Sequence, residues 1–426
     1  MGCPFFRGHI RMFSAYQIEK ATYMYADYWF FTHKKRISHD KISDFINMHK
    51  EDLKLIFSQT IILAEKNKLL SFDALYQDGY HVKANAAMKK GRTLKELKLR
   101  RKKVKKRLEE VLTKIQSPEK EDDDVMNKKK KYEEDLKRID DLQCELNKKI
   151  RQRTSNTTPS RKKELERSFQ VNETDKDSEI TKMKDGSYVN AYTKINAVDG
   201  KADIIVATDV SGHYDESHRL CRVTKQANDN CKGYGKYKKV CADSNFNTLG
   251  SSVNMEANGF QLIAPTKQHE KKRKQPEKYK NMIEYKYSKK DNTIRCSEGN
   301  ILHQTGQSVL RQFGCQTYLY SNENGCRKCK RKKECTQALF KEIRRDVRQA
   351  VQERVYKRYL SKKGQELYKK RMHAAEIFQA DQKQNGKFTQ LLRRGLKKVK
   401  AELMLQDITW NLRRIFQAAE GEIQWA

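Results

Sequence analysis

The chain has 426 residues, with 91 Lys or Arg against 55 Asp or Glu and a formal net charge of +36. A chain of this length can bury a core and form two or three structural units, but it has no run of about 18 apolar residues that could span a membrane. The charged fraction of 34% nearly equals the hydrophobic fraction of 37%, so part of the chain is expected to be solvated helix. Because the positive charge is spread along the whole chain, it indicates a polyanionic partner, with nucleic acid the first expectation.

The N-terminus and the cysteines predict the compartment. Residues 1–7 lack the basic and then apolar layout of a secretory signal. The ten cysteines are irregularly spaced and four of them cluster late in the chain, which favours free thiols and a metal site over a disulfide framework. We therefore expect a cytoplasmic protein, associated with the nucleoid if its partner is DNA.

Residues 1–70 are predicted to be helical. Apolar residues recur at helical spacing over residues 13–21, and a second amphipathic pattern covers residues 42–69. Ser38 stands where it can cap the helix that begins this second pattern. The segment is expected to be either part of a DNA-binding unit or a set of plain packing helices, and the sequence leaves both open.

Residues 71–88 are predicted to hold the first strand of an α/β core, an apolar and aromatic stretch that ends on Asp78. Residues 89–160 are predicted to form a coiled-coil hairpin and a polar linker, because apolar residues recur in two runs with alternating three- and four-residue steps. The recurring residues are Leu97, Val104, Leu108, Val111 and Ile115, then Tyr132, Leu136, Ile139, Leu146 and Ile150. The Lys- and Arg-rich flanks suit either DNA contact or a plain solvated arm.

Residues 161–290 are predicted to supply the other strands of the core. Two alternating stretches flank Asp199-Gly200, a strong hairpin turn signal, and a later strand is expected to end on Asp243. Residues 337–426 show helical periodicity, which we expect to begin near Ala338. Strands mixed with helices in this way predict an α/β fold.

Residues 291–336 contain a pair of cysteines, Cys326 and Cys329, separated by two residues. Thiolates at this spacing suit two positions of a tetrahedral Zn²⁺ site, since a tight turn sets the distance between them. Cys296 and Cys335 are the natural second pair. The prediction is a closed structural zinc site, and buried free cysteines beside a surface Cys-x2-Cys are the alternative.

Three carboxylates stand in positions that suit metal-dependent phosphoryl transfer. Asp78 and Asp243 end predicted strands, and Glu376 lies on a predicted helix. Two strand-end acids and one helix acid can converge on a pair of divalent cations, over which a cationic chain can hold DNA. Taken singly, each acid has a simpler interpretation: a turn or helix cap for the aspartates, and a solvent-facing residue for the glutamate.

Short motifs surround these acids. Residues 78–86 have the sequence DGYHVKANA, and residues 241–246 have the sequence CADSNF. A third motif, Tyr-x2-Arg-x4-Glu-x6-Lys, is formed by Tyr368, Arg371, Glu376 and Lys383. In the same order, the three motifs resemble the DGT-K-x-AN, ADxGY/F and Tyr-Arg-Glu-Lys elements of bacterial insertion-sequence transposases of the DDE class. The cysteines between the second and third acids resemble a cysteine-rich insertion found in part of that group.

The resemblance implies a ribonuclease-H-like mixed sheet with helices, in which Asp78, Asp243 and Glu376 meet around two Mg²⁺ or Mn²⁺ ions. It also implies residues that contact DNA phosphates: Tyr368, Arg371, Lys383, Lys83 and Asn85. Structural roles suit Lys83 and Asn85 equally well. To this core it adds the N-terminal helical region, the coiled-coil hairpin insertion and the zinc-knuckle insertion.

The predicted function is a DNA transposase. It would cleave double-stranded DNA at the terminal inverted repeats of an insertion sequence and join the freed 3′-hydroxyl to target DNA, as a homodimer in a synaptic complex. The alternatives are a related metal-dependent nuclease and an inactive or truncated transposase that only binds DNA.

Two departures from the group's pattern bear on this prediction. The second motif reads Asp-Ser-Asn-Phe rather than Asp-x-Gly-Tyr, so the turn after Asp243 is expected to be unusual. The chain also starts inside the group's N-terminal helical region, so we expect recognition of the terminal repeats to be incomplete.

Overall fold

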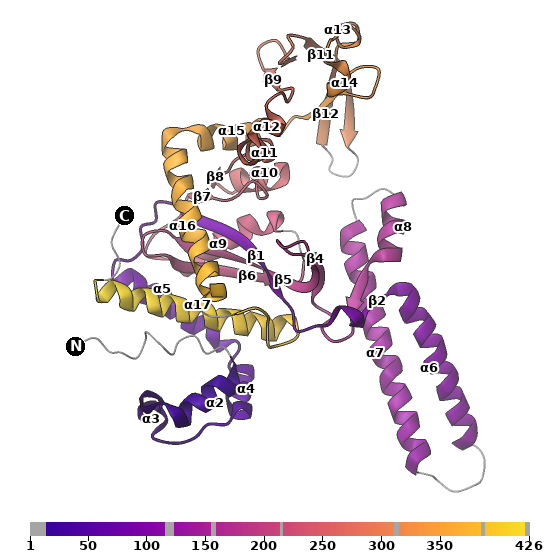
Figure 1. Cartoon of the computed structure of the whole chain (residues 1–426), viewed down its shortest axis with the longest axis vertical. Helices are drawn as coiled ribbons and strands as arrows, with labels where there is room; N and C mark the ends of the chain where they lie inside the picture. Colours follow the sequence, from indigo (N-terminus) through magenta and orange to yellow (C-terminus); the bar gives the residue numbers. More distant parts are fainter. Residues whose placement is uncertain are drawn as a thin grey trace.

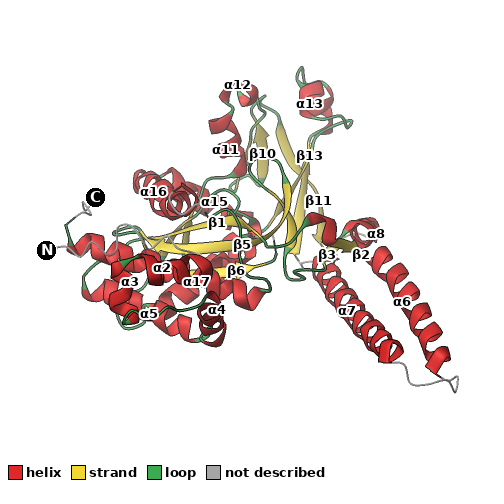
Figure 2. Cartoon of the chain, turned by 60° about the horizontal axis from the view of Figure 1, so that its bottom comes forward, coloured by secondary structure: helices red, strands yellow, loops and turns green. Residues whose placement is uncertain are grey.

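The computed structural model describes residues 14–115, 123–154, 159–213, 216–310, 315–384 and 388–421. They form a core built on a mixed sheet, a long two-helix arm and a strand-rich module (Figure 1). A second view shows the arm as a pair of helices that extends well beyond the core (Figure 2). Within these ranges, no helix has both the length and the apolar character needed to cross a membrane.

The N-terminal region contains four helices in its described part, and residues 1–13 lie outside that part. They are α2 (Ala15–Met24), α3 (Ala26–Thr32), α4 (His39–Met48) and α5 (Asp52–Lys66). Ser38 caps α4 as predicted, because its side chain accepts a hydrogen bond from the backbone N–H of Lys41. Buried apolar residues follow one side of α5, which packs against the last core helix, α17 (Leu396–Ala419).

The core sheet is mixed and, in the described residues, has six strands. They are β1 (Leu75–Lys83), β4 (Glu179–Lys182), β5 (Tyr188–Asp199), β6 (Ile204–Ser211), β7 (Lys239–Cys241) and β8 (Gln261–Ile263). β5 pairs antiparallel with β1 along one edge and with β4 and β6 along the other. β7 pairs parallel with β1, and β8 pairs parallel with β7. A mixed sheet with helices on its faces is compatible with the predicted ribonuclease-H-like fold.

Helices cover both faces of this sheet. α9 (Leu220–Asn230) packs on the face to which Gln77 points, since the Gln77 amide donates a hydrogen bond to Thr224 of α9. α16 (Lys362–Gln384) and α17 lie on the opposite face, where Lys194 of β5 contacts both. Side chains alternate along a strand, so Asp78, next to Gln77, faces α16. Further core helices are α10 (Leu249–Ala257), α11 (Lys267–Lys274), α12 (Pro276–Tyr279) and α15 (Gln349–Leu360).

The arm consists of α6 (Leu94–Ile115) and α7 (Asp123–Thr154), which pack side by side. Five residues of the predicted apolar repeat are buried in the cluster between them, namely Leu97, Val104, Ile139, Leu146 and Ile150, together with Leu142, which the prediction did not include. At the base of the arm, β2 (Gly91–Thr93) pairs with β3 (Gln170–Asn172) beside α8 (Pro159–Ser168). Residues 155–158 of the predicted linker lie outside the described residues.

The cysteine-rich region contains more strand than the sequence suggested. An antiparallel sheet is formed by β9 (Tyr285–Ser288), β10 (Thr293–Cys296), β11 (Ile301–Leu310), β12 (Cys315–Ser321) and β13 (Glu342–Asp346). Two short helices, α13 (Glu323–Arg327) and α14 (Lys332–Cys335), follow β12. The prediction of a helix from Ala338 was wrong, because residues 342–346 pair as an edge strand with β12 and the helix starts only at Gln349. Tertiary pairing here outweighs the helical preference of a charged segment.

The first core strand also differs from its prediction. It does not end on Asp78 but continues to Lys83. The reason is the long β5 partner, whose pairing with β1 extends from Leu75 to Lys83 without interruption. Asp78 therefore lies in the middle of a strand, with its backbone fixed on both sides.

A buried ion pair joins the sheet to α17. Lys194 of β5 and Asp407 of α17 have no exposed side-chain surface, and the Lys194 Nζ lies 2.5 Å from Oδ1 of Asp407. Burial raises the pKa of Asp407 and lowers that of Lys194, while the attraction between the two charges opposes both shifts.

We predict that Lys194→Met lowers the free energy of unfolding by about 3 to 5 kcal/mol, because it leaves the Asp407 carboxylate buried without a partner. Combining it with Asp407→Leu removes the unpaired charge and is expected to restore most of the loss. Urea unfolding of the two variants and the wild type measures this. If the double variant were as unstable as the single one, packing rather than charge would explain the loss.

Candidate active site

A cleft of about 790 Å³ lies where the core sheet meets α11 and α16. Its walls come from β1, the turn after β4, the loop after β7 and the two helices. Asp78, Asp243 and Glu376 all line it. The structure thus places on one cleft the three acids that the sequence singled out, although they lie far apart in the chain.

The pairing of β1 with β7 places the two aspartates beside each other. These strands are parallel neighbours, and Tyr76 of β1 stands opposite Cys241 of β7. Asp78 follows two residues later on β1. Asp243 follows two residues after Cys241, just past the end of β7, which stops at Cys241 and not at Asp243 as predicted. The two acids are therefore neighbours at the same level of the sheet. Glu376 comes from α16, which packs against both β1 and β7.

Asp78 is held by two residues of α16. Its side chain is only 15% exposed. Oδ2 accepts a hydrogen bond from the Gln379 amide at 3.0 Å, and Oδ1 lies 3.4 Å from Nη1 of Arg371. Burial raises the pKa of Asp78 to about 6, the Asp243 and Glu376 carboxylates add to the rise, and Arg371 and Gln379 oppose it. A carboxyl group perturbed in this way inside a cleft is typical of functional sites.

Asp243 stabilises the turn that follows β7. Its Oδ1 accepts hydrogen bonds from the backbone N–H groups of Asn245 at 2.8 Å and Phe246 at 3.3 Å. The Asn245 side-chain amide lies 3.4 Å from Oδ2. The non-standard residues after Asp243 thus form a turn closed by the acid itself. Asp243 therefore has the turn-capping role that the sequence analysis gave as its simpler interpretation, and it also lines the cleft.

Glu376 is exposed on α16 and has no hydrogen bond or ion pair with other described residues. The two signature residues before it are buried. The Tyr368 ring packs edge-on against Tyr359, with ring centroids 5.0 Å apart. The Arg371 guanidinium lies 5.2 Å from the centre of the Tyr368 ring and is 7% exposed. Arg371 therefore supports the cleft from within, between Asp78 and an aromatic ring.

The three other predicted contact residues differ in position. Lys83 is exposed at the end of β1. The Asn85 amide donates a hydrogen bond to the backbone carbonyl of Leu392 at 2.9 Å, and its Oδ1 accepts one from Arg394 at 3.2 Å. Asn85 therefore ties the end of β1 to the segment before α17. Lys383 belongs to α16, but its side chain lies outside the described residues.

The sequence did not single out several polar residues of this cleft. Gln379 lines a neighbouring cavity and reaches the cleft through its hydrogen bond to Asp78. Glu270 of α11 is buried at the cleft wall, and its Oε1 has no hydrogen-bond partner among the described residues. Glu216 approaches β1 so closely that any side chain at position 79 would collide with its carboxylate. A glycine directly after Asp78 is the one sequence signal that could have indicated such a neighbour. Glu270 lies within a run of Lys and Arg and looked like an ordinary solvated residue.

The predicted zinc ligands line a second, much smaller cavity. Cys296, Cys326, Cys329 and Cys335 surround a space of about 20 Å³ in the strand-rich module. The Tyr285 hydroxyl lies 3.0 Å from the Cys335 Sγ. A space of this size is about what one small bound species needs.

Neither site has the geometry of a formed metal centre. In the part of the chain that the structure describes, no group of three or more His, Cys, Asp or Glu side chains is arranged to hold a metal ion. The donor chemistry nevertheless differs clearly between the two sites. Carboxylate oxygens are the ligands that Mg²⁺ and Mn²⁺ prefer, and thiolates suit Zn²⁺.

We predict that Asp78→Asn makes the metal-free protein more stable than the wild type as the pH rises. The folded state raises the pKa of Asp78 from 3.8 to about 6, so stability from its protonated form is present below pH 3.8 and is lost as the pH passes 6. The difference is at most about 3 kcal/mol. Urea unfolding with a chelator, below pH 4 and above pH 7, measures it.

Asp229→Asn on α9 is the matched control, since that carboxylate is exposed and remains in solvent in both states. If both variants changed stability equally between the two pH values, the folded cleft would not disfavour the Asp78 carboxylate.

Comparison with known proteins adds one finding. Residues 295–416 match the family model of the transposase DDE domain. No curated protein matches the chain. The matched segment contains Glu376, Arg371 and the four clustered cysteines, while Asp78 and Asp243 precede it. This match, on the helix that completes the acidic cleft, supports a DDE transposase.

Proposed function

We propose that the chain is a DNA transposase that cleaves DNA at the ends of an insertion sequence and joins the freed 3′-hydroxyl to target DNA. The observation that carries the proposal is the cleft itself, where Asp78, Asp243 and Glu376 come together from three separate segments. The match of residues 295–416 to the transposase DDE domain and the net charge of +36 support the same function.

Asp78, Asp243 and Glu376 would hold divalent ions, Mg²⁺ or Mn²⁺. Such ions activate the attacking water or hydroxyl and stabilise the leaving oxygen in phosphoryl transfer. Asp78 is engaged by Arg371 and Gln379, so these two side chains would have to release it when an ion binds.

The rest of the cleft suits a DNA backbone. Lys182 at the end of β4 and Lys184 in the turn after it line the cleft on one side, and Arg273 and Lys274 line it from α11. All four are exposed, and they form two positive rims around the acids. Cations in these positions would bind phosphates on either side of the bond that is cut. Two element ends must be held at once, so we expect two chains in the working complex.

We predict that Glu376→Gln lowers Mg²⁺-dependent nicking of a duplex carrying the element's ends by about a thousandfold or more, because one ligand of the reacting centre is lost. Duplex binding is expected to remain, since the change leaves the positive rims intact. Glu366→Gln is the matched control, an exposed residue on the same helix. It is expected to nick like the wild type.

Two other results would point elsewhere. If neither the wild type nor the variants nick DNA while all of them bind it, the chain is a DNA-binding protein derived from a transposase. The hydrogen bonds that already engage Asp78 and Asp243 are what favours this second candidate. If nicking occurs without joining, the chain is a related nuclease.

We also propose that Cys296, Cys326, Cys329 and Cys335 bind one structural Zn²⁺ in the strand-rich module. The support is their position around a single small cavity and the two-residue spacing of Cys326 and Cys329. Their thiols would have to move closer together to bind the ion.

We predict that replacing both Cys326 and Cys329 with Ser removes about one zinc per chain and destabilises the module, because metal binding contributes directly to folding in such sites. Elemental analysis of the purified protein measures the zinc. Cys144→Ser, at an exposed thiol of α7, is the control and should keep the metal. Equal metal content in all three proteins would rule out the zinc site.

A further inference from the structure

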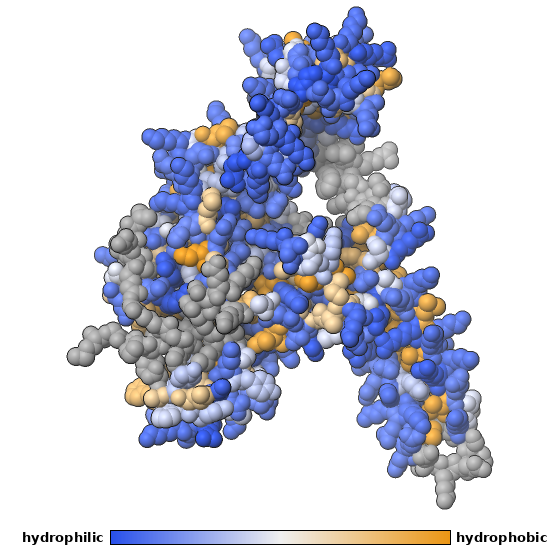
Figure 3. Space-filling view, in the orientation of Figure 1, coloured by the Kyte–Doolittle hydropathy of each residue, from blue (hydrophilic) through white to orange (hydrophobic). Residues whose placement is uncertain are grey.

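We propose that α6 of the arm is a second DNA-binding surface, which grips the duplex backbone outside the acidic cleft without reading its sequence. This inference rests on the proposed function only in taking duplex DNA as the partner. The arm projects from the core (Figure 1), and its visible surface is mainly hydrophilic (Figure 3).

The first four turns of α6 carry a large excess of positive over negative charge. Residues 94–108 contain nine Lys or Arg and a single acid, Glu96. The Glu96 carboxylate caps the start of the helix, since it accepts a hydrogen bond from the backbone N–H of Thr93 at 2.7 Å. The facing segment of α7, residues 133–151, contains six acids and five bases. The excess of positive charge in the arm therefore lies on α6, while the facing part of α7 is nearly balanced.

The positive charges of α6 are mostly unneutralised. Arg100 pairs with Glu173, Arg101 with Asp140, and Lys105 lies 3.8 Å from Glu109. The other six bases of residues 94–108 have no ion pair with any described residue. They are Lys95, Lys98, Lys102, Lys103, Lys106 and Arg107, and all of them are exposed.

The arrangement of these bases opposes helix stability. Lys98, Lys102 and Lys106 follow one another at four-residue steps, so like charges are neighbours on the helix surface. Lys95, Lys102 and Lys106 lie on the side away from the buried Leu97 and Val104. A polyanion lying along this outer side would relieve the repulsion.

The size of the surface fits duplex DNA. α6 has 22 residues and is about 33 Å long, close to the length of one turn of DNA. A groove beside α7 is lined by Lys98 and Lys102 together with the Arg101–Asp140 pair. Duplex DNA has one phosphate for about every 1.7 Å of its length, so several bases of α6 can face phosphates at once.

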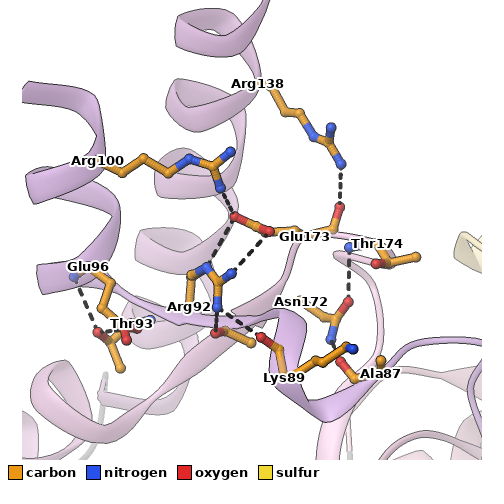
Figure 4. A network of polar contacts seen from close by, with 11 residues as sticks. Ala87, Lys89, Arg92, Thr93, Glu96, Arg100, Arg138, Asn172, Glu173 and Thr174 are labelled. Carbon is orange, nitrogen blue, oxygen red and sulfur yellow. Dashed lines mark hydrogen bonds and ion pairs between the residues drawn. The ribbon is translucent and has the colours of Figure 1, made fainter. Parts of the chain in front are cut away.

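The base of the arm fixes this surface relative to the core (Figure 4). Glu173, just after β3, accepts ion pairs from Arg92 and Arg100, and its backbone carbonyl accepts a hydrogen bond from Arg138 of α7. The Asn172 amide donates a hydrogen bond to the carbonyl of Ala87 at 2.8 Å. One acid thus links both arm helices to the strand pair at their base. A surface held this firmly can position a long ligand against the core.

The test compares two variants of the full chain with equal loss of charge. The arm variant carries Lys95→Gln, Lys102→Gln and Lys106→Gln. The control variant carries Lys232→Gln, Lys236→Gln and Lys238→Gln, at exposed lysines that precede β7. Affinity for a random-sequence duplex is measured over a series of salt concentrations. Replacing the three arm lysines with Arg keeps the charge and tests whether charge, rather than the lysine side chain itself, determines the affinity.

We predict that the arm variant binds the duplex about tenfold or more weakly at moderate salt, and that its plot of log affinity against log salt loses about 2 to 3 units of slope. The control variant should lose less than one unit, and the Arg variant should bind like the wild type. Equal slopes for the arm and control variants would overturn the inference, even if the wild type nicks DNA.

Two further results would also decide the matter. If a structured RNA competes for the arm more strongly than the duplex does, the arm is an RNA-binding surface and the inference is wrong. If the wild type binds no duplex at all, both the arm surface and the proposed function fail.

Discussion

The parallel pairing of β1 with β7 is the constraint on which the candidate site depends. Because Tyr76 stands opposite Cys241, two acids 165 positions apart come to lie at the same level of one sheet. β1 can hold this position because its other edge pairs with β5 along the full length of the strand. Asp78 therefore stands on rigid strand backbone and Asp243 directly after a strand, which suits the proposed catalytic role.

The same sheet explains what the sequence could and could not predict. The acids stood out because short strands and a charged helix carried them in recognisable motifs. Their neighbours did not, since Gln379 and Glu270 become relevant only when α16 and α11 pack against the sheet. Sequence periodicity also gave the wrong secondary structure for residues 342–346. These residues form a strand because they pair with the edge of β12. Helices with their own buried repeat, such as α6 and α7, were predictable because their pattern is local.

Among the described residues, charged side chains are paired in the core but largely unpaired on the surface of the arm. In the core, Lys194 and Asp407 form an ion pair that is shielded from solvent and joins β5 to α17. On the arm, most bases of α6 form no ion pair with another described residue and are exposed. A buried pair specifies how elements pack, whereas an unneutralised surface leaves its attraction free for a partner. The net charge of +36 is therefore best understood as surface charge, in agreement with a polyanionic ligand.

Arg371 is a buried cation that lies beside the acids of the cleft. Its guanidinium lies between Asp78 and the Tyr368 ring, where it partly offsets the negative charge of three acids on one cleft. In the proposed function Asp78 would hold a divalent ion, which would supply positive charge to the acids, and Arg371 would be released from its pairing with Asp78. Since Arg371 and Glu376 belong to the same helix, the displaced cation would remain beside the acids. The Arg371 guanidinium would then contact a DNA phosphate beside the acids. Its present pairing with Asp78 is therefore compatible with the phosphate contact that its motif implies.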